Sequence, residues 1–200
     1  MKTISTQCRG LLLALLVSIM LTACSTLPVG MFSSSANREN PAAYEEALAL
    51  MDSGHLEAAE TTLLRLTKRY RRSAGPWINL SIIYARTQRH EQAEAALNRA
   101  LELDPRSAVA YNHLGILLRR DGRFEQADQA YAKAIRFDPE YGLAYLNYGV
   151  LADLYLQRPE RALAYFQRYQ ELQGEEDQQV RRWIIELERR VATKTAQVSP

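Results

Sequence analysis

The sequence predicts an all-α fold in which four helical hairpins stack into a solenoid and one further helix covers the end of the stack. Three observations predict it. Similar residues recur every 34 positions from Asn40 onward, each block contains two apolar stretches with helical spacing, and a turn with helix-breaking residues separates the two stretches. Such hairpins form a core by stacking on their neighbours. The predicted hairpins are residues 40–73, 74–107, 108–141 and 142–175.

Residues 1–23 are interpreted as an export signal that is removed from the mature chain. Two cations precede an apolar run, and the predominantly apolar stretch, residues 10–23, has only 14 residues, whereas a membrane-spanning helix needs about 20. The cations stay cytoplasmic, so the body of the chain is exported. After removal of this segment one cysteine remains, so no intramolecular disulfide is expected.

The segment Leu21-Thr22-Ala23-Cys24 resembles the lipobox of bacterial lipoproteins. The resemblance implies that Cys24 becomes the first mature residue and carries a diacylglyceryl thioether and an N-acyl chain such as palmitate, which together anchor a protein stably to a membrane. In that family an Asp after the cysteine marks inner-membrane retention. The next residue here is Ser25, which implies the periplasmic face of the outer membrane, with the inner membrane as the alternative. An uncleaved anchor in which Cys24 is incidental is the other interpretation.

Residues 24–39 are predicted to be a flexible tether, because they contain several Ser residues with Pro and Gly and show no helical period. A segment of this length spans about 20 Å, which would hold the folded part clear of the lipid headgroups. Docking of Val29, Met31 and Phe32 on the first helix is the alternative.

The 34-residue blocks agree column by column. Small residues recur at some positions and aromatic residues at others, so rings can fill the gaps between closely approaching helices. The fourth block fits the later columns only with one residue inserted near Leu156. The aligned sets include Ala43, Trp77, Tyr111 and Tyr145; Ala47, Ser81, Gly115 and Gly149; and Ala59, Ala93 and Ala127.

These blocks resemble tetratricopeptide repeats, which implies a right-handed α-solenoid. The first block departs most from that pattern, with Ala43 in place of a large aromatic residue, Glu46 in place of an apolar residue and Arg71 in place of a proline. The third block matches the pattern most closely, at Tyr111, Leu114, Gly115, Leu118, Gly122, Phe124, Ala127, Tyr131, Ala134 and Pro139.

Residues 176–192 are predicted to form a capping helix, because apolar residues recur on one face and charged residues occupy the other. A partner-binding helix is the alternative, since Trp183 and Ile185 widen the apolar surface. Residues 193–200 are predicted to be a disordered tail.

The sequence contains no motif for catalysis, a metal or a cofactor. The nine glycines are dispersed, which excludes a phosphate-binding loop, and His55, His90 and His113 lie in different blocks without metal-ligand spacing. The net charge of +2 comes from Lys2 and Arg9, and the remaining charges cancel. We therefore expect no enzymatic activity and no broad electrostatic binding of nucleic acid.

In the tetratricopeptide family the first helices of successive hairpins line a concave groove that receives a peptide or a partner helix. Asparagine amides of this groove can pair with a ligand backbone, and its arginines indicate an acidic or C-terminal carboxylate on the ligand, with solvated arginines as the alternative. The family's carboxylate clamp needs Lys and Asn where this chain has Tyr44 and Leu48, so a chaperone-tail receptor is not expected. The predicted groove residues are Tyr44, Leu48, Ile78, Asn79, Ile82, Arg86, Asn112, His113, Ile116, Arg119, Arg120, Leu146, Asn147 and Val150.

These features predict a lipid-anchored scaffold of a Gram-negative periplasm that binds envelope proteins through its groove. Proteins of similar layout serve as pilotins for pilus or secretion pores, as adaptors for wall hydrolases and as accessory parts of energy-transducing complexes, and pilus biogenesis is the sharpest of these predictions. One alternative is a self-assembling structural protein that buries Trp183 against another copy, and the oligomeric state stays open. Another is an enzyme, which would need a deep pocket with perturbed ionisable groups near His90 or His113.

Overall fold

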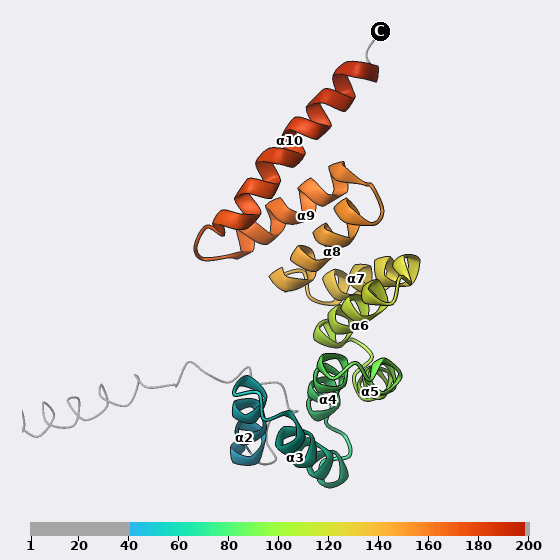
Figure 1. Ribbon diagram of the computed structural model, residues 1–200, viewed down its shortest axis with the longest axis vertical. Helices are drawn as coiled ribbons and strands as arrows, with labels where there is room; N and C mark the ends of the chain where they lie inside the picture. Colours follow the sequence, from blue (N-terminus) through green and yellow to red (C-terminus); the bar gives the residue numbers. More distant parts are fainter. Residues whose placement is uncertain (1–40, 199–200) are drawn as a thin grey trace, which may run out of the picture. The chain divides into compact units, whose positions relative to one another are not determined.

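The computed structural model describes residues 41–198, all of which belong to one compact unit. Its regular structure is helical throughout this described range (Figure 1). The predicted export signal, Cys24 and the tether lie outside the described residues. The helices are α2 (Pro41–Asp52), α3 (Leu56–Arg69), α4 (Gly75–Arg86), α5 (His90–Leu103), α6 (Ala108–Arg120), α7 (Phe124–Phe137), α8 (Gly142–Leu154), α9 (Pro159–Leu172) and α10 (Gln178–Val198).

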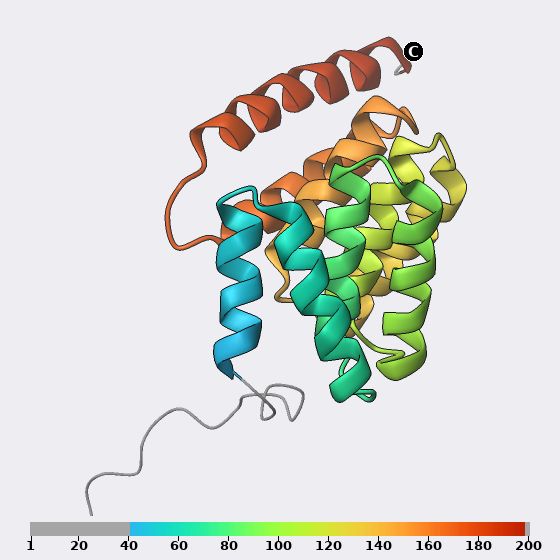
Figure 2. The same ribbon diagram turned by 60° about the horizontal axis from the view of Figure 1, so that its bottom comes forward.

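The helices from α2 to α9 form four consecutive hairpins, each an A helix followed by a B helix that packs beside it (Figure 2). The A helices are α2, α4, α6 and α8, and the B helices are α3, α5, α7 and α9. Each later A helix packs against the B helix of the preceding hairpin, and neighbouring A helices also contact each other, α4 with α6 and α6 with α8. The predicted all-α helical-repeat solenoid is therefore confirmed.

The turn inside each hairpin contains the same backbone feature. A residue with positive φ follows each A helix, at Gly54, Gln88, Gly122 and Gln157. The first three are 34 residues apart, and the fourth comes one residue later, which agrees with the predicted insertion near Leu156. Glycine adopts this conformation at no steric cost, whereas the two glutamines do so under the constraint of the turn.

The two helices of a hairpin approach closely where a small residue on the A helix meets a large side chain on the B helix. A methyl group on Gly115 would lie 2.6 Å from Tyr131 Cε1, and one on Gly149 would lie 2.5 Å from Phe166 Cε1. Real side chains do not tolerate such contacts, so the rings occupy the space that a larger A-helix residue would need.

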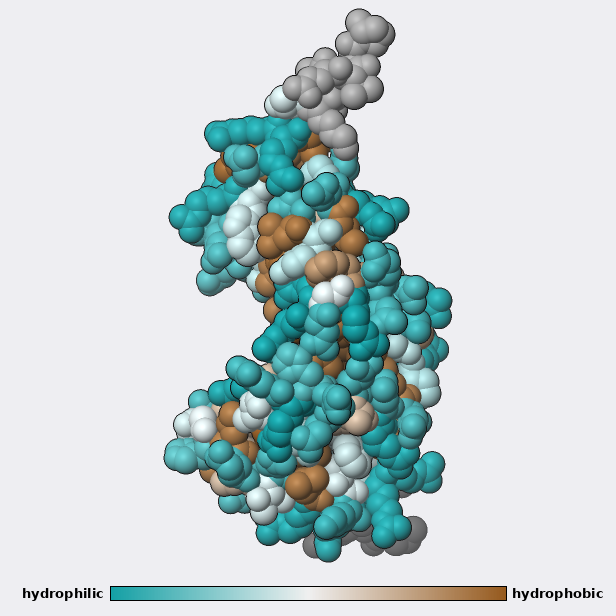
Figure 3. Space-filling view, turned by 45° about the vertical axis from the view of Figure 1, so that its right-hand side comes forward, coloured by the Kyte–Doolittle hydropathy of each residue, from teal (hydrophilic) through white to brown (hydrophobic). Residues whose placement is uncertain are grey.

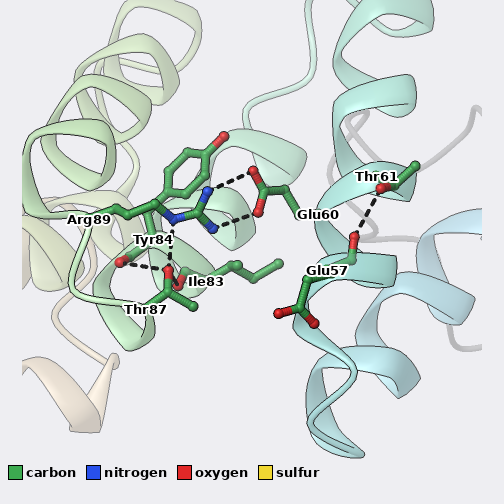
Figure 4. Close-up of polar contacts among 7 residues, drawn as sticks. All are labelled: Glu57, Glu60, Thr61, Ile83, Tyr84, Thr87 and Arg89. Atoms are coloured by element: carbon green, nitrogen blue, oxygen red, sulfur yellow. Dashed lines mark hydrogen bonds and ion pairs between the residues drawn. The ribbon is translucent and has the colours of Figure 1, made fainter.

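Adjacent hairpins are also joined by ion pairs that recur with the repeat. The Arg89 guanidinium contacts the Glu60 carboxylate through Nη1 (3.0 Å) and Nη2 (2.5 Å), and it lies over the Tyr84 ring at 4.5 Å (Figure 4). Arg89 precedes α5, whereas Glu60 belongs to α3 of the hairpin before. Two equivalent pairs follow along the chain, Arg123 with Glu94 at 2.6 Å and Arg158 with Asp128 at 3.3 Å.

The last helix covers α9 with an apolar face, as its predicted capping role requires. Val180 and Leu187 are buried, Ile184 packs beside them, and the Trp183 ring lies 5.3 Å from that of Phe166. The Asp177 carboxylate accepts hydrogen bonds from the backbone N–H groups of the first turn.

The predicted end of this helix at residue 192 is wrong, because α10 continues to Val198. The extension contains alanine, lysine and glutamine, which have favourable helix propensities. The prediction followed the end of the apolar face, but a helix that has already nucleated can extend beyond its packed part. Among residues 41–198, no helix is both long and apolar enough to cross a membrane.

Candidate functional site

The predicted groove residues all lie on A helices, and we call the surface that they share the A-helix face. Its aliphatic members follow the repeat, since Leu48, Ile82, Ile116 and Val150 occupy the same position of successive hairpins and all are half-buried. A row of partly exposed aliphatic side chains thus crosses four helices. Such a row can take apolar anchors from another polypeptide.

The asparagines of this face bond to neighbouring helices, which differs from their predicted role as ligand-binding amides. Asn79 Nδ2 donates to the Tyr44 hydroxyl at 2.6 Å. Asn112 is buried, donates through Nδ2 to the Tyr141 hydroxyl at 3.3 Å and accepts at Oδ1 from Asn147 Nδ2 at 3.0 Å. These amides hold successive A helices in register, because a buried polar group needs a partner and the nearest one belongs to the adjacent hairpin.

A pocket of about 230 Å³ opens on the A-helix face between α4, α5 and α6. It brings together five of the predicted groove residues, and sequence analysis missed the other five that complete it. The predicted members are Ile82, Arg86, His113, Ile116 and Arg120, and the further members are Ser81, Ala85, Ala93, Leu97 and Leu117.

The pocket exists because one column of the repeat holds a small residue at this hairpin. The column reads Met51, Ala85, Arg119 and Asp153. Met51 is buried, and Asp153 pairs with Arg190 Nη1 at 2.7 Å, so larger side chains extend from the other three positions. This column is visible in the aligned blocks and is the signal that would have located the pocket.

The arginines of the A-helix face differ in the hydrogen bonds that their guanidinium groups form within the protein. Arg86 Nη1 donates to the backbone carbonyl of Met51 at 3.0 Å. The Arg119 Nε is buried without a hydrogen-bond partner in the described structure, and its guanidinium lies 5.9 Å from the Tyr155 ring centroid. Arg120 is exposed, and its side chain forms no hydrogen bond or ion pair within residues 41–198. The mouth of the pocket is therefore electropositive.

The pocket does not assemble the groups that acid–base or nucleophilic catalysis needs. Burial lowers the pKa of the His113 imidazole, which favours its neutral form at pH 7. Ser81 donates its hydroxyl to the Ile78 carbonyl at 2.5 Å, and the ten lining residues include no carboxylate. His90 lies elsewhere, with Nδ1 at 2.6 Å from Asp121 Oδ1. No cluster of three potential metal ligands occurs within the described range.

Exposed apolar side chains are more frequent toward the C-terminal hairpins. Figure 3 shows hydrophobic patches separated by hydrophilic surface rather than one continuous apolar face on the side that it views. The exposed large hydrophobic residues of the described chain are Leu64, Val109, Leu143, Leu154, Tyr155, Trp183 and Ile185.

Solved structures with similar folds include several described as tetratricopeptide repeat proteins, and a transferase. Pseudomonas aeruginosa pilF matches with a TM-score of 0.69 and 22% identity over 76% of this chain and 69% of that chain. The crystal structure of MamA matches with a TM-score of 0.57 and 26% identity over 66% and 77%. A Thermobaculum terrenum O-GlcNAc transferase mutant matches with a TM-score of 0.59 and 25% identity, but over only 26% of its own length and 64% of this chain. The search of curated proteins gave no match.

Two family models, both described as tetratricopeptide repeat, match residues 72–140 and 113–181. Together they span more than half of the 200 residues, and they cover the hairpins whose stacking, turns and ring-to-small-residue contacts recur with the 34-residue period. The chain belongs to the tetratricopeptide repeat family.

Proposed function

We propose that this protein is a lipid-anchored scaffold of the bacterial cell envelope that binds a peptide or helix of partner proteins on its A-helix face. Tetratricopeptide repeat proteins are generally protein–protein interaction scaffolds. Partner binding is therefore the general part of the proposal, and the role in the envelope is the specific part. The observation that carries it is the aliphatic row from Leu48 to Val150 with an open, electropositive pocket in its middle. A non-enzymatic role agrees with the chemistry of that pocket.

The envelope location rests on the sequence. An export signal followed by Leu21-Thr22-Ala23-Cys24 supports lipidation at Cys24 and retention on the periplasmic face of the outer membrane. Anchoring would keep the scaffold at high local concentration near its partners, so modest affinity would suffice. Within this class of role, assembly of an envelope machine such as a type IV pilus or a secretion pore is our more specific proposal.

The lipid anchor is tested by fractionation of the full-length chain and its Cys24→Ala variant. We expect the wild-type protein in the membrane fraction and the variant in the soluble periplasmic fraction. Unchanged membrane retention of the variant would refute lipidation as the anchor.

The binding face is tested by cross-linking and affinity purification from intact envelopes. Ile82→Glu with Ile116→Glu places two charges in the aliphatic row, and we expect co-purifying envelope proteins to be lost while the circular dichroism spectrum stays helical. The matched control is Thr61→Glu with Ala95→Glu, which adds the same charges at exposed positions of α3 and α5. Equal loss in both double variants would contradict a specific role for the A-helix face.

Self-assembly is the second candidate function, and α10 is the observation that favours it. Trp183 is 36% exposed and Ile185 is 40% exposed, which is unusual for large apolar residues on a capping helix. Light scattering of the full-length protein in detergent should then show a stable oligomer that Trp183→Ser dissociates. A monomer would remove this candidate.

A further inference from the structure

Each neighbouring pair of hairpins presents the same set of positions around the place where the α4–α6 pocket lies. In the α4–α6 junction these positions include Ala85 and Leu97, and in the next junction the repeat places Arg119 and Tyr131 there. The side chains at these two positions are longer at the second junction, where Tyr131 and the Arg119 Nε are buried. At the first junction the smaller side chains border a pocket of about 230 Å³ that is open to a guest.

The chemistry of the lining indicates what can enter. The walls include the aliphatic side chains of Ile82, Leu97, Ile116 and Leu117, which favour an aliphatic guest because burial of apolar surface drives association. His113 is driven toward its neutral form by burial and so supplies no charge at pH 7.

The rim indicates a second feature of the guest. Arg120 is exposed and has no acidic partner among the described residues, and Arg86 stands beside it in the lining with one nitrogen bound to the Met51 carbonyl. No carboxylate lines the pocket to neutralise these cations. A carboxylate on the guest would complete a charge-assisted contact at the rim.

The aliphatic row continues on both sides of the pocket, with Leu48 on one side and Val150 on the other. A guest that stopped at the pocket would leave half of this row uncovered. The row thus favours a chain that passes through, whose acidic group is a side chain and not a chain terminus.

On the basis of the proposed function, we infer that the pocket between α4, α5 and α6 is the anchor site of the face. It receives one aliphatic side chain of an internal segment of a partner polypeptide, and Arg120, with Arg86 beside it, binds an Asp or Glu side chain adjacent to that residue. Ala85 determines this specificity, because its small side chain leaves the space open.

The test uses the full-length lipidated protein in detergent and fluorescein-labelled, C-terminally amidated peptides with a central Leu-Glu pair in a Gly-Ser-Ala background. Fluorescence anisotropy should show saturable binding that falls about tenfold or more when the peptide carries Ala-Glu, because a buried leucine side chain is lost. Ala85→Met should cause a similar fall by filling the pocket, as Met51 fills the equivalent position. The matched control, Ala132→Met at an exposed position of α7, should bind like the wild type.

The carboxylate is tested with Arg120→Gln and a Leu-Gln peptide. We expect Arg120→Gln to weaken the Leu-Glu peptide about tenfold and to leave the Leu-Gln peptide unchanged, whereas Arg72→Gln, an exposed arginine outside the pocket, changes neither. Equal weakening of both peptides would overturn the carboxylate assignment. Tighter binding of a Leu peptide that ends in a free carboxylate would overturn the internal-segment assignment.

Absence of saturable binding by the Leu-Glu peptide, or equal binding by Ala85→Met, would overturn the anchor site. A different result would contradict the proposed function, namely equal cross-linking of envelope proteins to the A-helix face and to the B helices. If cross-linking to the A-helix face persists in Ala85→Met, the face binds a partner and only the anchor site is wrong.

Discussion

The junction between α4 and α6 and the junction between α6 and α8 are built from the same columns of the repeat, yet they present different chemistry. At the first, Ser81, Ala85 and Leu97 leave a pocket with aliphatic walls. At the second, Gly115 approaches the Tyr131 ring, and Arg119 stands in the place of Ala85. Both junctions have the same backbone arrangement. The presence of a pocket at the first of them therefore arises from side-chain volume. A repeat fold thus fixes where sites can occur, and single residues decide which of them are open.

The largest effect should come from replacing the leucine that occupies the same repeat position at each junction. Leu117 lines the pocket and Leu151 is its equivalent, fully buried in the next hairpin. Leu151→Ala should lower the free energy of unfolding by about 3 to 5 kcal/mol and Leu117→Ala by about 2 to 3 kcal/mol, because the side chains around Leu117 can relax where they border the pocket and so leave a smaller cavity. Urea denaturation measures both. A larger loss for Leu117→Ala would contradict the difference in packing between the junctions.

The second effect depends on pH and concerns Tyr131 at the junction between α6 and α8. Burial raises the pKa of Tyr131 to about 12, and Arg119 nearby offsets part of the rise. The folded chain therefore holds this proton more tightly than the unfolded chain does. The resulting stabilisation is present below pH 10 and is lost as the pH rises toward 12, by up to about 2 to 3 kcal/mol.

Denaturation midpoints at pH 8, 10 and 11.5, measured for the wild type and for Tyr131→Phe, check this dependence. The wild type should lose more stability than the variant across the interval, since Phe does not titrate. Leu97→Met, at the equivalent position of the open junction, is the matched control and should keep the wild-type slope. Parallel curves for wild type and Tyr131→Phe would contradict a buried, protonated Tyr131.

The third effect tests the match between small residues and rings. Gly115→Ala should destabilise the fold by about 1 to 3 kcal/mol, because the new methyl group would lie 2.6 Å from Tyr131 Cε1. Adding Tyr131→Leu should recover most of that loss, since Ser81 and Leu97 already combine a Cβ with a smaller partner at the equivalent positions. Thermal unfolding of the two single variants and the double variant gives the coupling energy. Additive effects would show that the two positions do not constrain each other.

The smallest effect concerns the ion pairs that recur between hairpins, here Arg89 with Glu60 between the first two hairpins and Arg158 with Asp128 between the last two. Arg89→Gln and Arg158→Gln should each reduce stability by about 0.5 to 1 kcal/mol at low salt, and less at high salt, because the pairs are partly exposed. The Arg89 pair should contribute more, since both of its Nη atoms contact Glu60. Chemical denaturation at two salt concentrations measures the difference. A loss that is independent of salt would mean that packing of the arginine stem, and not its charge, stabilises the junction.

The sequence predicted the hairpins because their signals are local and periodic. Apolar spacing and the turn residues indicate where the A and B helices lie, and the recurring columns give their stacking. The extension of α10 to Val198 carries no periodic signal, since it depends on helix propensity beyond the last packed turn.

The site was predicted only in part, for a physical reason. Ile82, Arg86, His113, Ile116 and Arg120 line one pocket, as helical geometry allows, and their role in partner binding stays a prediction. That Asn112 is buried and bonded to neighbouring hairpins depends on side-chain geometry across 29 and 35 residues, which a sequence pattern does not contain. The pocket depends on the small side chain of Ala85, and it can be predicted only when Ala85 is compared with the larger residues at the equivalent repeat positions.

The most direct test of the account is site-specific photo-cross-linking of the full-length protein in intact envelopes. A benzophenone amino acid replaces Val109, an exposed residue at the start of α6, or Gln92, an exposed residue on α5. We predict a discrete cross-linked polypeptide from Val109 that disappears when Ala85→Met is added, and none from Gln92. A Val109 adduct that persists with Ala85→Met, or equal adducts from both positions, would contradict binding through the open junction.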